Sequence, residues 1–268
     1  MANTIPIFDS HFHIIDRRFP LVANQGYVPQ SFTCEDYLNR TKDLNIVGGA
    51  VVSGSFHGFD QGYLIDALNT LGPSFVGVTQ LPPSVSDEEV IRLNKAGVRA
   101  IRCNLRRMGP QAIEHTETLA KRVYEIARWH VEFYLGSKDL PHLFPLLSRL
   151  PSISIDHLGL SREGFPYLLR LVEKGARVKA SGFGRVELNV KEALITIHSI
   201  NPQALMFGTD LPSTRSPRPF SNRDIRLVLD ALGEDAIKVF YHNAIDFYRP
   251  EAFLKPQQHI FGGESWKQ

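Results

Sequence analysis

The sequence feature that most constrains the fold is an alternation of apolar, strand-like segments with helix-like segments along nearly the whole chain. Strands are predicted over 5–13, 46–52, 74–78, 98–104, 131–135, 153–157, 177–181 and 204–210. Helices are predicted after them, over 35–44, 61–71, 86–97, 114–128, 139–150, 165–174, 190–200 and 222–232. Continuous apolar strands that alternate with helices are typical of a parallel sheet covered on both faces.

Eight strand-then-helix units are the number that a closed (β/α)8 barrel requires, and 268 residues is an ordinary length for one such domain. An open doubly wound sheet is the alternative, but the first strand turn lacks the glycine fingerprint of a dinucleotide-binding fold. We therefore predict an α/β fold with a single (β/α)8 TIM barrel domain over 1–268. A loop insertion at 14–31 is long enough to cover or shape a site, and a short C-terminal extension follows Tyr248.

Composition excludes several classes of protein. The 30 basic and 28 acidic residues leave a net charge of +2, so no strong field recruits nucleic acid or a membrane surface. Cys34 and Cys103 stand far apart and form no Cys-x-x-Cys pair, which argues against a disulfide scaffold and a structural zinc cluster. No signal peptide or long apolar run is present, so we expect a cytoplasmic protein, and a homo-oligomer is left open.

The first predicted strand ends in an acid and two histidines, Asp9-Ser10-His11-Phe12-His13. Because strand side chains alternate faces, we expect Asp9, His11 and His13 to point the same way. Two imidazoles on one face can jointly hold a metal ion or polarise a substrate oxygen. An exposed edge strand is the alternative, which the apolar residues running into the pair disfavour.

Other polar residues fall at the ends of later strands, where barrel enzymes carry their catalytic groups. These residues are Arg102 and Asn104 with Arg106 and Arg107 beyond them, Tyr134, Asp156 and His157, Lys179 with Arg185 nearby, and Asp210.

Each has an alternative role. His157 could be a structural partner of Asp156, Asp210 could cap a turn, the arginines could be solvated surface charge, and Tyr134 could simply line the barrel. Among the remaining histidines only His57 is retained as a further candidate site residue.

Three motifs together resemble the amidohydrolase superfamily: Asp-Ser-His-Phe-His at 9–13, Ile-Asp-His-Leu-Gly at 155–159 and Gly-Thr-Asp-Leu-Pro at 208–212. More narrowly they resemble its amidohydrolase-related (amidohydrolase 2) branch, which includes the 2-pyrone-4,6-dicarboxylate lactonases. The resemblance covers residues 7 to about 248 and implies a (β/α)8 barrel.

The resemblance also implies roles. Asp210 would act as general base on water, and His11, His13 and His157 would polarise the scissile carbonyl. In metal-using relatives such positions bind a divalent ion, here by His11, His13 and Asp210. The residues expected to hold substrate carboxylates are Arg102, Arg106 or Arg107, Tyr134 and Arg185.

The sequence departs from that pattern at two places. Many metal-using members carry a lysine or glutamate on strand four and a histidine on strand five, where this chain has Arg102-Cys103-Asn104 and Tyr134. Tyrosine at strand five is what the metal-free lactonases show, which favours metal-independent hydrolysis. Leu160 stands where the pyrone lactonases would place an arginine, and this weakens an assignment to the pyrone dicarboxylate itself.

We therefore expect a hydrolase that opens a carboxylate-bearing lactone or similar cyclic ester, with a small-molecule substrate and no nucleic-acid or membrane partner. The expected cofactor is none, or one divalent metal, zinc or manganese. A metal-dependent lyase that decarboxylates its substrate is the alternative, followed by a non-catalytic barrel that binds an acidic ligand.

Overall fold

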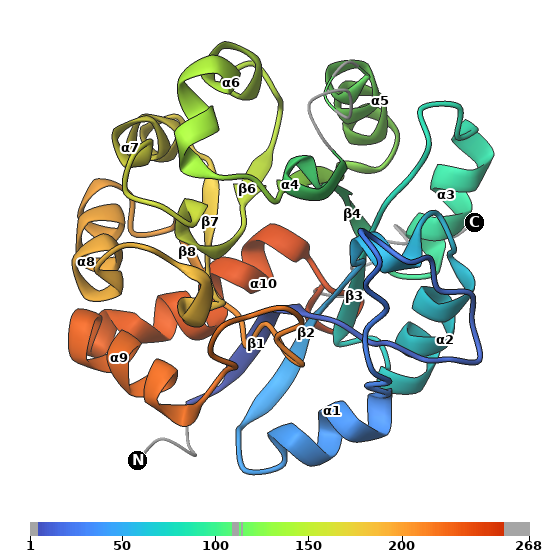
Figure 1. Ribbon diagram of the computed structural model, residues 1–268, viewed down its shortest axis with the longest axis horizontal. Helices are drawn as coiled ribbons and strands as arrows, with labels where there is room; N and C mark the ends of the chain where they lie inside the picture. Colours follow the sequence, from blue (N-terminus) through green and yellow to red (C-terminus); the bar gives the residue numbers. More distant parts are fainter. Residues whose placement is uncertain (1–4, 109–112, 114, 255–268) are drawn as a thin grey trace, which may run out of the picture.

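The computed structural model describes residues 5–108, 113 and 115–254. Its centre is one eight-stranded parallel sheet in the order β1-β2-β3-β4-β5-β6-β7-β8, ringed by helices (Figure 1). The strands are β1 (Ile7–Phe12), β2 (Ile46–Val52), β3 (Phe75–Thr79), β4 (Val98–Cys103), β5 (His130–Phe133), β6 (Ile153–Ile155), β7 (Arg177–Ala180) and β8 (Leu205–Phe207). Ser10 Oγ of β1 donates to the Met206 carbonyl of β8 at 3.3 Å, so the first and last strands lie side by side. The predicted (β/α)8 barrel is confirmed.

The surrounding helices are close to those expected from the sequence. They are α1 (Cys34–Thr41), α2 (Gly62–Leu71), α3 (Asp87–Lys95), α5 (Thr116–Ala127), α6 (Leu140–Leu147), α7 (Phe165–Glu173), α8 (Val190–Ile200) and α9 (Asn222–Leu232). Thr33, Ser86 and Asn189 accept hydrogen bonds from backbone N–H groups of the first turn and so fix the start of three of them. None of the described helices is long and apolar enough to cross a membrane.

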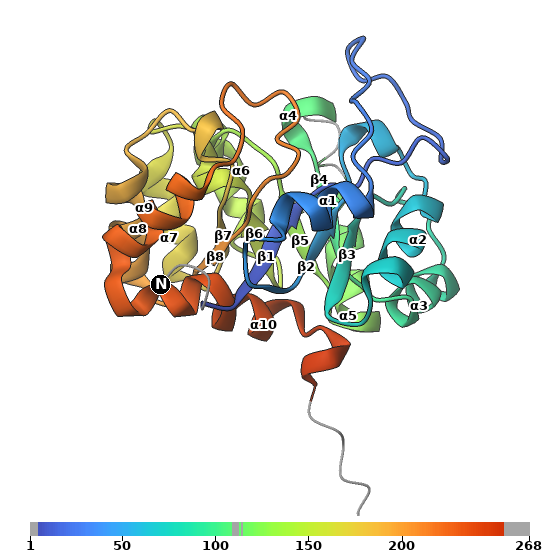
Figure 2. The same ribbon diagram turned by 90° about the horizontal axis from the view of Figure 1, so that it is seen from below.

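Two further helices were not expected from the sequence. Helix α4 (Leu105–Met108) directly follows β4, and α10 (Asn243–Tyr248) crosses the end of the barrel opposite the loops after β1 and β8 (Figure 2). The ring of Tyr248 stacks on Phe8 inside the barrel, with 5.5 Å between centroids. Helix α10 therefore closes the bottom of the barrel and leaves the opposite end for a site. Of the predicted extension after Tyr248, residues 255–268 lie outside the described part.

Strand β1 does not alternate strictly, and the expectation that Asp9 shares a face with the two histidines is wrong. The pairing with β2 shifts in register between Asp9 and Phe12. Asp9 accepts a hydrogen bond from the Tyr37 hydroxyl of α1 at 3.1 Å, and Phe12 stacks on the same Tyr37 ring. The His11 and His13 rings instead contact each other, with 5.1 Å between centroids. A register shift moves side chains to the other face, which the sequence does not reveal.

Candidate active site

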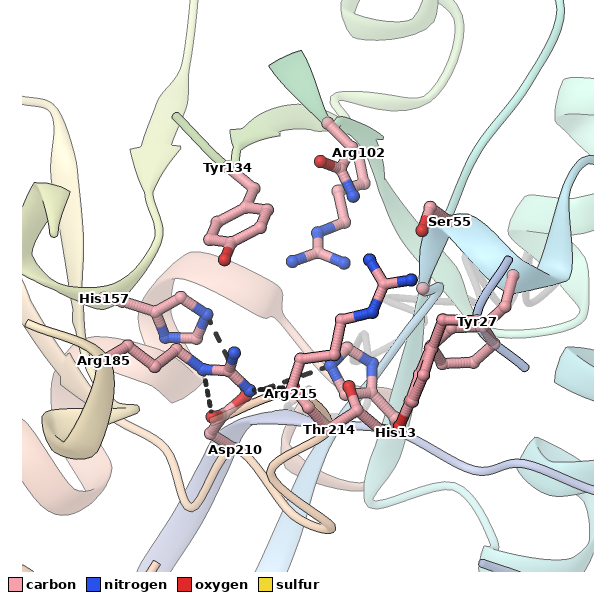
Figure 3. A pocket seen from close by; sticks show the side chains of 13 residues that line it. His13, Tyr27, Ser55, Arg102, Tyr134, His157, Arg185, Asp210, Thr214 and Arg215 are labelled. Carbon is pink, nitrogen blue, oxygen red and sulfur yellow. Dashed lines mark hydrogen bonds and ion pairs between the residues drawn. The ribbon is translucent and has the colours of Figure 1, made fainter. Parts of the chain in front are cut away.

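A pocket of about 420 Å³, including its open mouth, lies at the C-terminal ends of the strands (Figure 3). Its wall combines strand ends with the loops after β1, β2 and β8. It is lined by His13, Tyr27, Gly54, Ser55, Phe56, Arg102, Asn104, Tyr134, His157, Arg185, Asp210, Thr214 and Arg215. The volume suits a small molecule, and the position is where barrel enzymes bind their substrates.

Asp210 stands at the floor of this pocket against three histidines. Its Oδ1 atom lies 3.9 Å from His11 Nε2, 4.0 Å from His13 Nε2 and 3.9 Å from His157 Nε2. Its Oδ2 atom accepts a hydrogen bond from Arg185 Nε at 2.6 Å. Asp210 Oδ1 is buried and accepts no hydrogen bond from the described residues. One carboxylate oxygen is therefore held in place while the other is free to accept a proton.

The three histidines are neutral at neutral pH because they are buried. Burial lowers the pKa of His11 and of His13 well below the usual value, and it lowers the pKa of His157 to about 4. His13 Nδ1 lies 2.6 Å from the Val52 carbonyl oxygen, which can only accept, so this nitrogen carries the proton. His13 Nε2 and Asp210 Oδ1 are then both acceptors, and a group that lies between them must be a hydrogen-bond donor or a cation. A water molecule meets this condition.

His11 has two neighbours that favour opposite tautomers. Its Nδ1 atom lies 3.1 Å from Lys179 Nζ and 3.4 Å from Asp156 Oδ1. An ammonium that donates to Nδ1 places the ring proton on Nε2, which can then donate to a substrate oxygen. A proton on Nδ1 that faces Asp156 leaves a lone pair on Nε2, the arrangement that a metal-binding histidine needs.

The residues present also fit a divalent metal ion. His11, His157 and Asp210 offer ligand atoms that all lie within 4.8 Å of one another. Two of these atoms, His11 Nε2 and Asp210 Oδ1, have no hydrogen-bond partner among the described residues. The set predicted from the sequence, His11, His13 and Asp210, shares two members with this group. A histidine-carboxylate set of this kind is typical of a catalytic zinc site.

Charged side chains below the histidines form a buried network. Arg102 Nη2 donates to Asp156 Oδ2 at 2.9 Å, and Lys179 forms ion pairs with Glu132 and with Asp156, the latter at 3.6 Å. Burial alone would raise the pKa of Asp156, but the positive charges of Lys179 and Arg102 hold the pKa of this carboxyl well below its usual range. Asp156 is therefore ionised and is paired with Arg102 and Lys179.

The remaining predicted site residues have different positions. Arg102, Tyr134 and Arg185 line the pocket, with the Arg102 guanidinium 5.3 Å from the centre of the Tyr134 ring. Arg106 is exposed on α4 and is not part of the pocket wall. The side chain of Arg107 lies outside the described part of the structure.

Sequence reasoning missed four polar residues of the wall. They are Tyr27, Ser55, Thr214 and Arg215. All four lie in the segments that follow β1, β2 and β8, and none belongs to a motif. The only signal was the length of the insertion at 14–31, which predicted a loop over the site and contains Tyr27.

His57, retained as a further candidate site residue, has a structural role. It is buried outside the pocket wall, where Nδ1 accepts a hydrogen bond from the Gly54 N–H at 3.0 Å and Nε2 donates to the Ile14 carbonyl at 3.0 Å. Both nitrogens are used by the neutral ring, so the histidine joins the loop after β1 to the loop after β2. Protonation of Nδ1 would break the contact with Gly54.

This arrangement predicts a dependence of stability on pH. Burial lowers the pKa of His57 to about 3, below its value of about 6.5 in an unfolded chain. As the pH falls from about 6.5 towards 3, the unfolded state binds a proton that the folded state does not, and stability is lost by about 1.4 kcal/mol per pH unit for this group.

Replacement of His57 by Gln is expected to make the urea-unfolding free energy fall less steeply between pH 6.5 and 5. His142→Gln, on the exposed part of α6, is the matched control and should keep the wild-type slope. Equal slopes in the two variants would contradict this assignment.

Comparison with known proteins places this chain in a family. The model of the Amidohydrolase family (Amidohydro_2) matches residues 8–249, which is most of the chain. The chain therefore belongs to the amidohydrolase family, and the resemblance carried by the three motifs is confirmed.

Two curated relatives are hydrolases of lactones by name. A 2-pyrone-4,6-dicarboxylate hydrolase from Comamonas testosteroni is 29% identical over 156 residues, which cover 56% of this chain and 51% of the relative. A 4-sulfomuconolactone hydrolase from Hydrogenophaga intermedia is 25% identical over 228 residues, which cover 76% of this chain and 74% of the relative. The first of these matches spans about half the length of the relative.

A solved structure from Pseudomonas putida, provisionally named as a 2-pyrone-4,6-dicarboxylic acid hydrolase, is similar over almost its whole length. The TM-score is 0.78 at 26% identity, with 94% of this chain and 99% of that chain covered. Together with the family match, these similarities confirm the expected enzyme class, a hydrolase of the amidohydrolase superfamily.

Proposed function

We propose that this protein hydrolyses a lactone or similar cyclic ester that carries an anionic group, with Asp210 as the general base. The observation that carries the proposal is the free Asp210 Oδ1 atom, which faces three neutral imidazoles at 3.9 to 4.0 Å in a pocket lined by arginines. The names of the relatives support the same substrate class, since both describe a cyclic ester with acidic substituents.

The reaction follows from the donors and acceptors at this centre. Asp210 Oδ1 takes a proton from water, and the water oxygen attacks the ester carbonyl carbon. His11, with its ring proton on Nε2, donates to the oxygen that becomes negatively charged. The bond from the carbonyl carbon to the ring oxygen then breaks, and the proton held by Asp210 passes to the leaving oxygen. The product is a ring-opened acid with a free hydroxyl or its keto form.

The same residues leave room for a metal. A divalent ion held by His11, His157 and Asp210 would supply positive charge that polarises the ester carbonyl. His13 lies next to this group, 4.0 Å from Asp210, and its Nε2 atom faces the same space.

Arg102 is paired with Asp156, and we expect the same guanidinium to bind the substrate. Its Nε and Nη2 donate to Asp156, and its Nη1 donates to the Ser53 carbonyl at 2.7 Å. A guanidinium has five N–H groups, so Arg102 can make these bonds and still present N–H groups to the pocket, which a lysine ammonium with three cannot do. Arg102→Lys keeps the charge beside Asp156 but loses the fork. We expect KM to rise about tenfold with a smaller change in kcat, measured by steady-state kinetics on an anionic lactone.

Arg106→Lys, at an exposed position that is not part of the pocket wall, is the control for this substitution and should leave KM unchanged. If KM were also unchanged in Arg102→Lys, the binding role of Arg102 would be wrong.

The experiment that tests the proposed function is a pH-stat assay of purified protein on a small set of lactones. The set contains 2-pyrone-4,6-dicarboxylate, 4-sulfomuconolactone and an uncharged lactone. We expect enzyme-dependent acid release from at least one anionic compound and little from the uncharged one. No acid release from any of them would reject the proposal.

A metal-dependent lyase is the second candidate, and the group formed by His11, His157 and Asp210 favours it. It predicts carbon dioxide release that depends on added zinc. A non-catalytic barrel would bind an acidic ligand and gain thermal stability without turnover.

A further inference from the structure

Three guanidinium groups line the pocket, and two of them are neutralised by carboxylates of the protein. Arg102 pairs with Asp156 at 2.9 Å. Arg185 pairs with Asp210 at 2.6 Å and also donates to the Thr214 carbonyl at 2.8 Å. Each of these arginines is therefore bound at one edge by a negative charge that the fold already supplies.

Arg215 differs from both. Its Nη2 atom donates to the Asn24 carbonyl, and its Nη1 atom lies 3.4 Å from Asn24 Oδ1. Its guanidinium stands 4.2 Å from the centre of the Tyr27 ring. Among the described residues, no carboxylate forms an ion pair with Arg215. Within the described structure, Arg215 is thus the arginine of the pocket wall whose charge is not paired with a carboxylate, unlike Arg102 and Arg185.

The loop after β1 holds the Arg215 fork in place. Asn24 occupies the outer edge of the guanidinium with neutral oxygens, and Tyr27 covers one face. Figure 3 shows the guanidinium pointing into the pocket, toward Arg102 and Ser55 and away from Asp210. A fork that is already ordered loses little conformational entropy when a ligand binds, which strengthens binding.

We propose that Arg215 is the residue that selects an anionic substituent on the substrate, a carboxylate or a sulfonate, and that this group lies beside Arg215 and Ser55 while the scissile ester lies at Asp210. This inference rests on the proposed lactone hydrolysis and adds the position of the anion and the residue that reads it. A guanidinium suits both anions, since each offers oxygens to a pair of parallel N–H groups.

The test compares Arg215→Gln with the wild type on an anionic lactone and on an uncharged lactone of the same ring size. Loss of a charge-assisted contact is expected to lower kcat/KM for the anionic lactone about 10- to 100-fold, mainly through KM. The rate on the uncharged lactone should stay the same. For the anionic lactone, kcat/KM of Arg215→Lys should lie between the values of the wild type and of Arg215→Gln, because a lysine keeps the charge but not the fork.

Arg226→Gln is the matched control. It removes the same charge from an exposed position on α9 and should leave both substrates unaffected. A carboxylated and a sulfonated lactone are assayed side by side, and the one that suffers the larger loss in Arg215→Gln identifies the anion that this residue reads. An equal loss on anionic and uncharged lactones would show a structural role only and would overturn the proposal, as would unchanged kinetics. If Arg215→Gln does not fold, the same comparison is made with Arg215→Lys.

Calorimetric binding of the anionic lactone separates failure of this inference from failure of the proposed function. The measurement uses Asp210→Asn protein, in which turnover is expected to be slowed by about 10²- to 10⁴-fold, with and without Arg215→Gln. Binding that is lost with Arg215→Gln supports the anion site even if the wild type hydrolyses no lactone. Binding that is retained with Arg215→Gln overturns the anion site even if hydrolysis is observed.

Discussion

Asp210→Asn is expected to lower kcat for lactone hydrolysis by about 10²- to 10⁴-fold with little change in KM. The amide that replaces the carboxylate cannot take a proton from water. The amide oxygen can still accept the hydrogen bond that Arg185 Nε makes to Asp210 Oδ2, so the loop after β8 should keep its place. The effect therefore reports the loss of the base rather than the loss of the fold.

Thermal melting of the same variant checks that the barrel is intact. Asp230→Asn, exposed on α9, removes the same charge at a distance from the pocket and should retain full activity. Full turnover by Asp210→Asn would remove Asp210 from the mechanism.

Lys179→Met is expected to destabilise the protein by about 3 to 5 kcal/mol. Lys179 is fully buried and forms ion pairs with Glu132 and Asp156, which are also fully buried. A methionine has nearly the same length but no charge. Within the described part of the chain, Glu132 would then keep only His130 and the Tyr248 hydroxyl as partners. Urea unfolding at neutral pH measures the loss.

The double variant Lys179→Met with Glu132→Gln isolates the cause of that loss. If the destabilisation comes from an uncompensated buried carboxylate, the second substitution should recover part of it, because both charges are then absent. If Lys179→Met alone were as stable as the wild type, the stabilising role assigned to the ion pairs of Lys179 with Glu132 and Asp156 would be wrong.

The barrel could be predicted from the sequence because most of its strands are apolar and several of its helices begin at capping residues, such as Thr33, Ser86 and Asn189. Strand ends of a closed parallel barrel meet at one end of it, so Asp210, His157 and the histidine pair at the end of β1 had to converge once the strands were placed. The position of Asp9 could not be predicted, since a register shift inside β1 leaves no mark in the alternation of residue types.

The rest of the site depends on contacts between segments far apart in the chain. Arg215 and Asn24 are separated by 191 positions, and no local pattern links them. For Glu132 the sequence does indicate a buried partner, because an acid between Val131 and Phe133 in an apolar strand must be paired when it is buried. The sequence could not show that its partner is Lys179, two strands further on.

The central claim is that water activated at Asp210 opens an ester ring, and the most direct test is the product formed in water enriched in a heavy oxygen isotope. Wild-type protein and an anionic lactone are incubated in this water, and the product is analysed by mass spectrometry with carbon dioxide monitored in parallel. We predict one heavy oxygen in the new carboxylate of the ring-opened acid and no carbon dioxide. A product that contains no heavy oxygen, or one that is formed with release of carbon dioxide, would contradict the account.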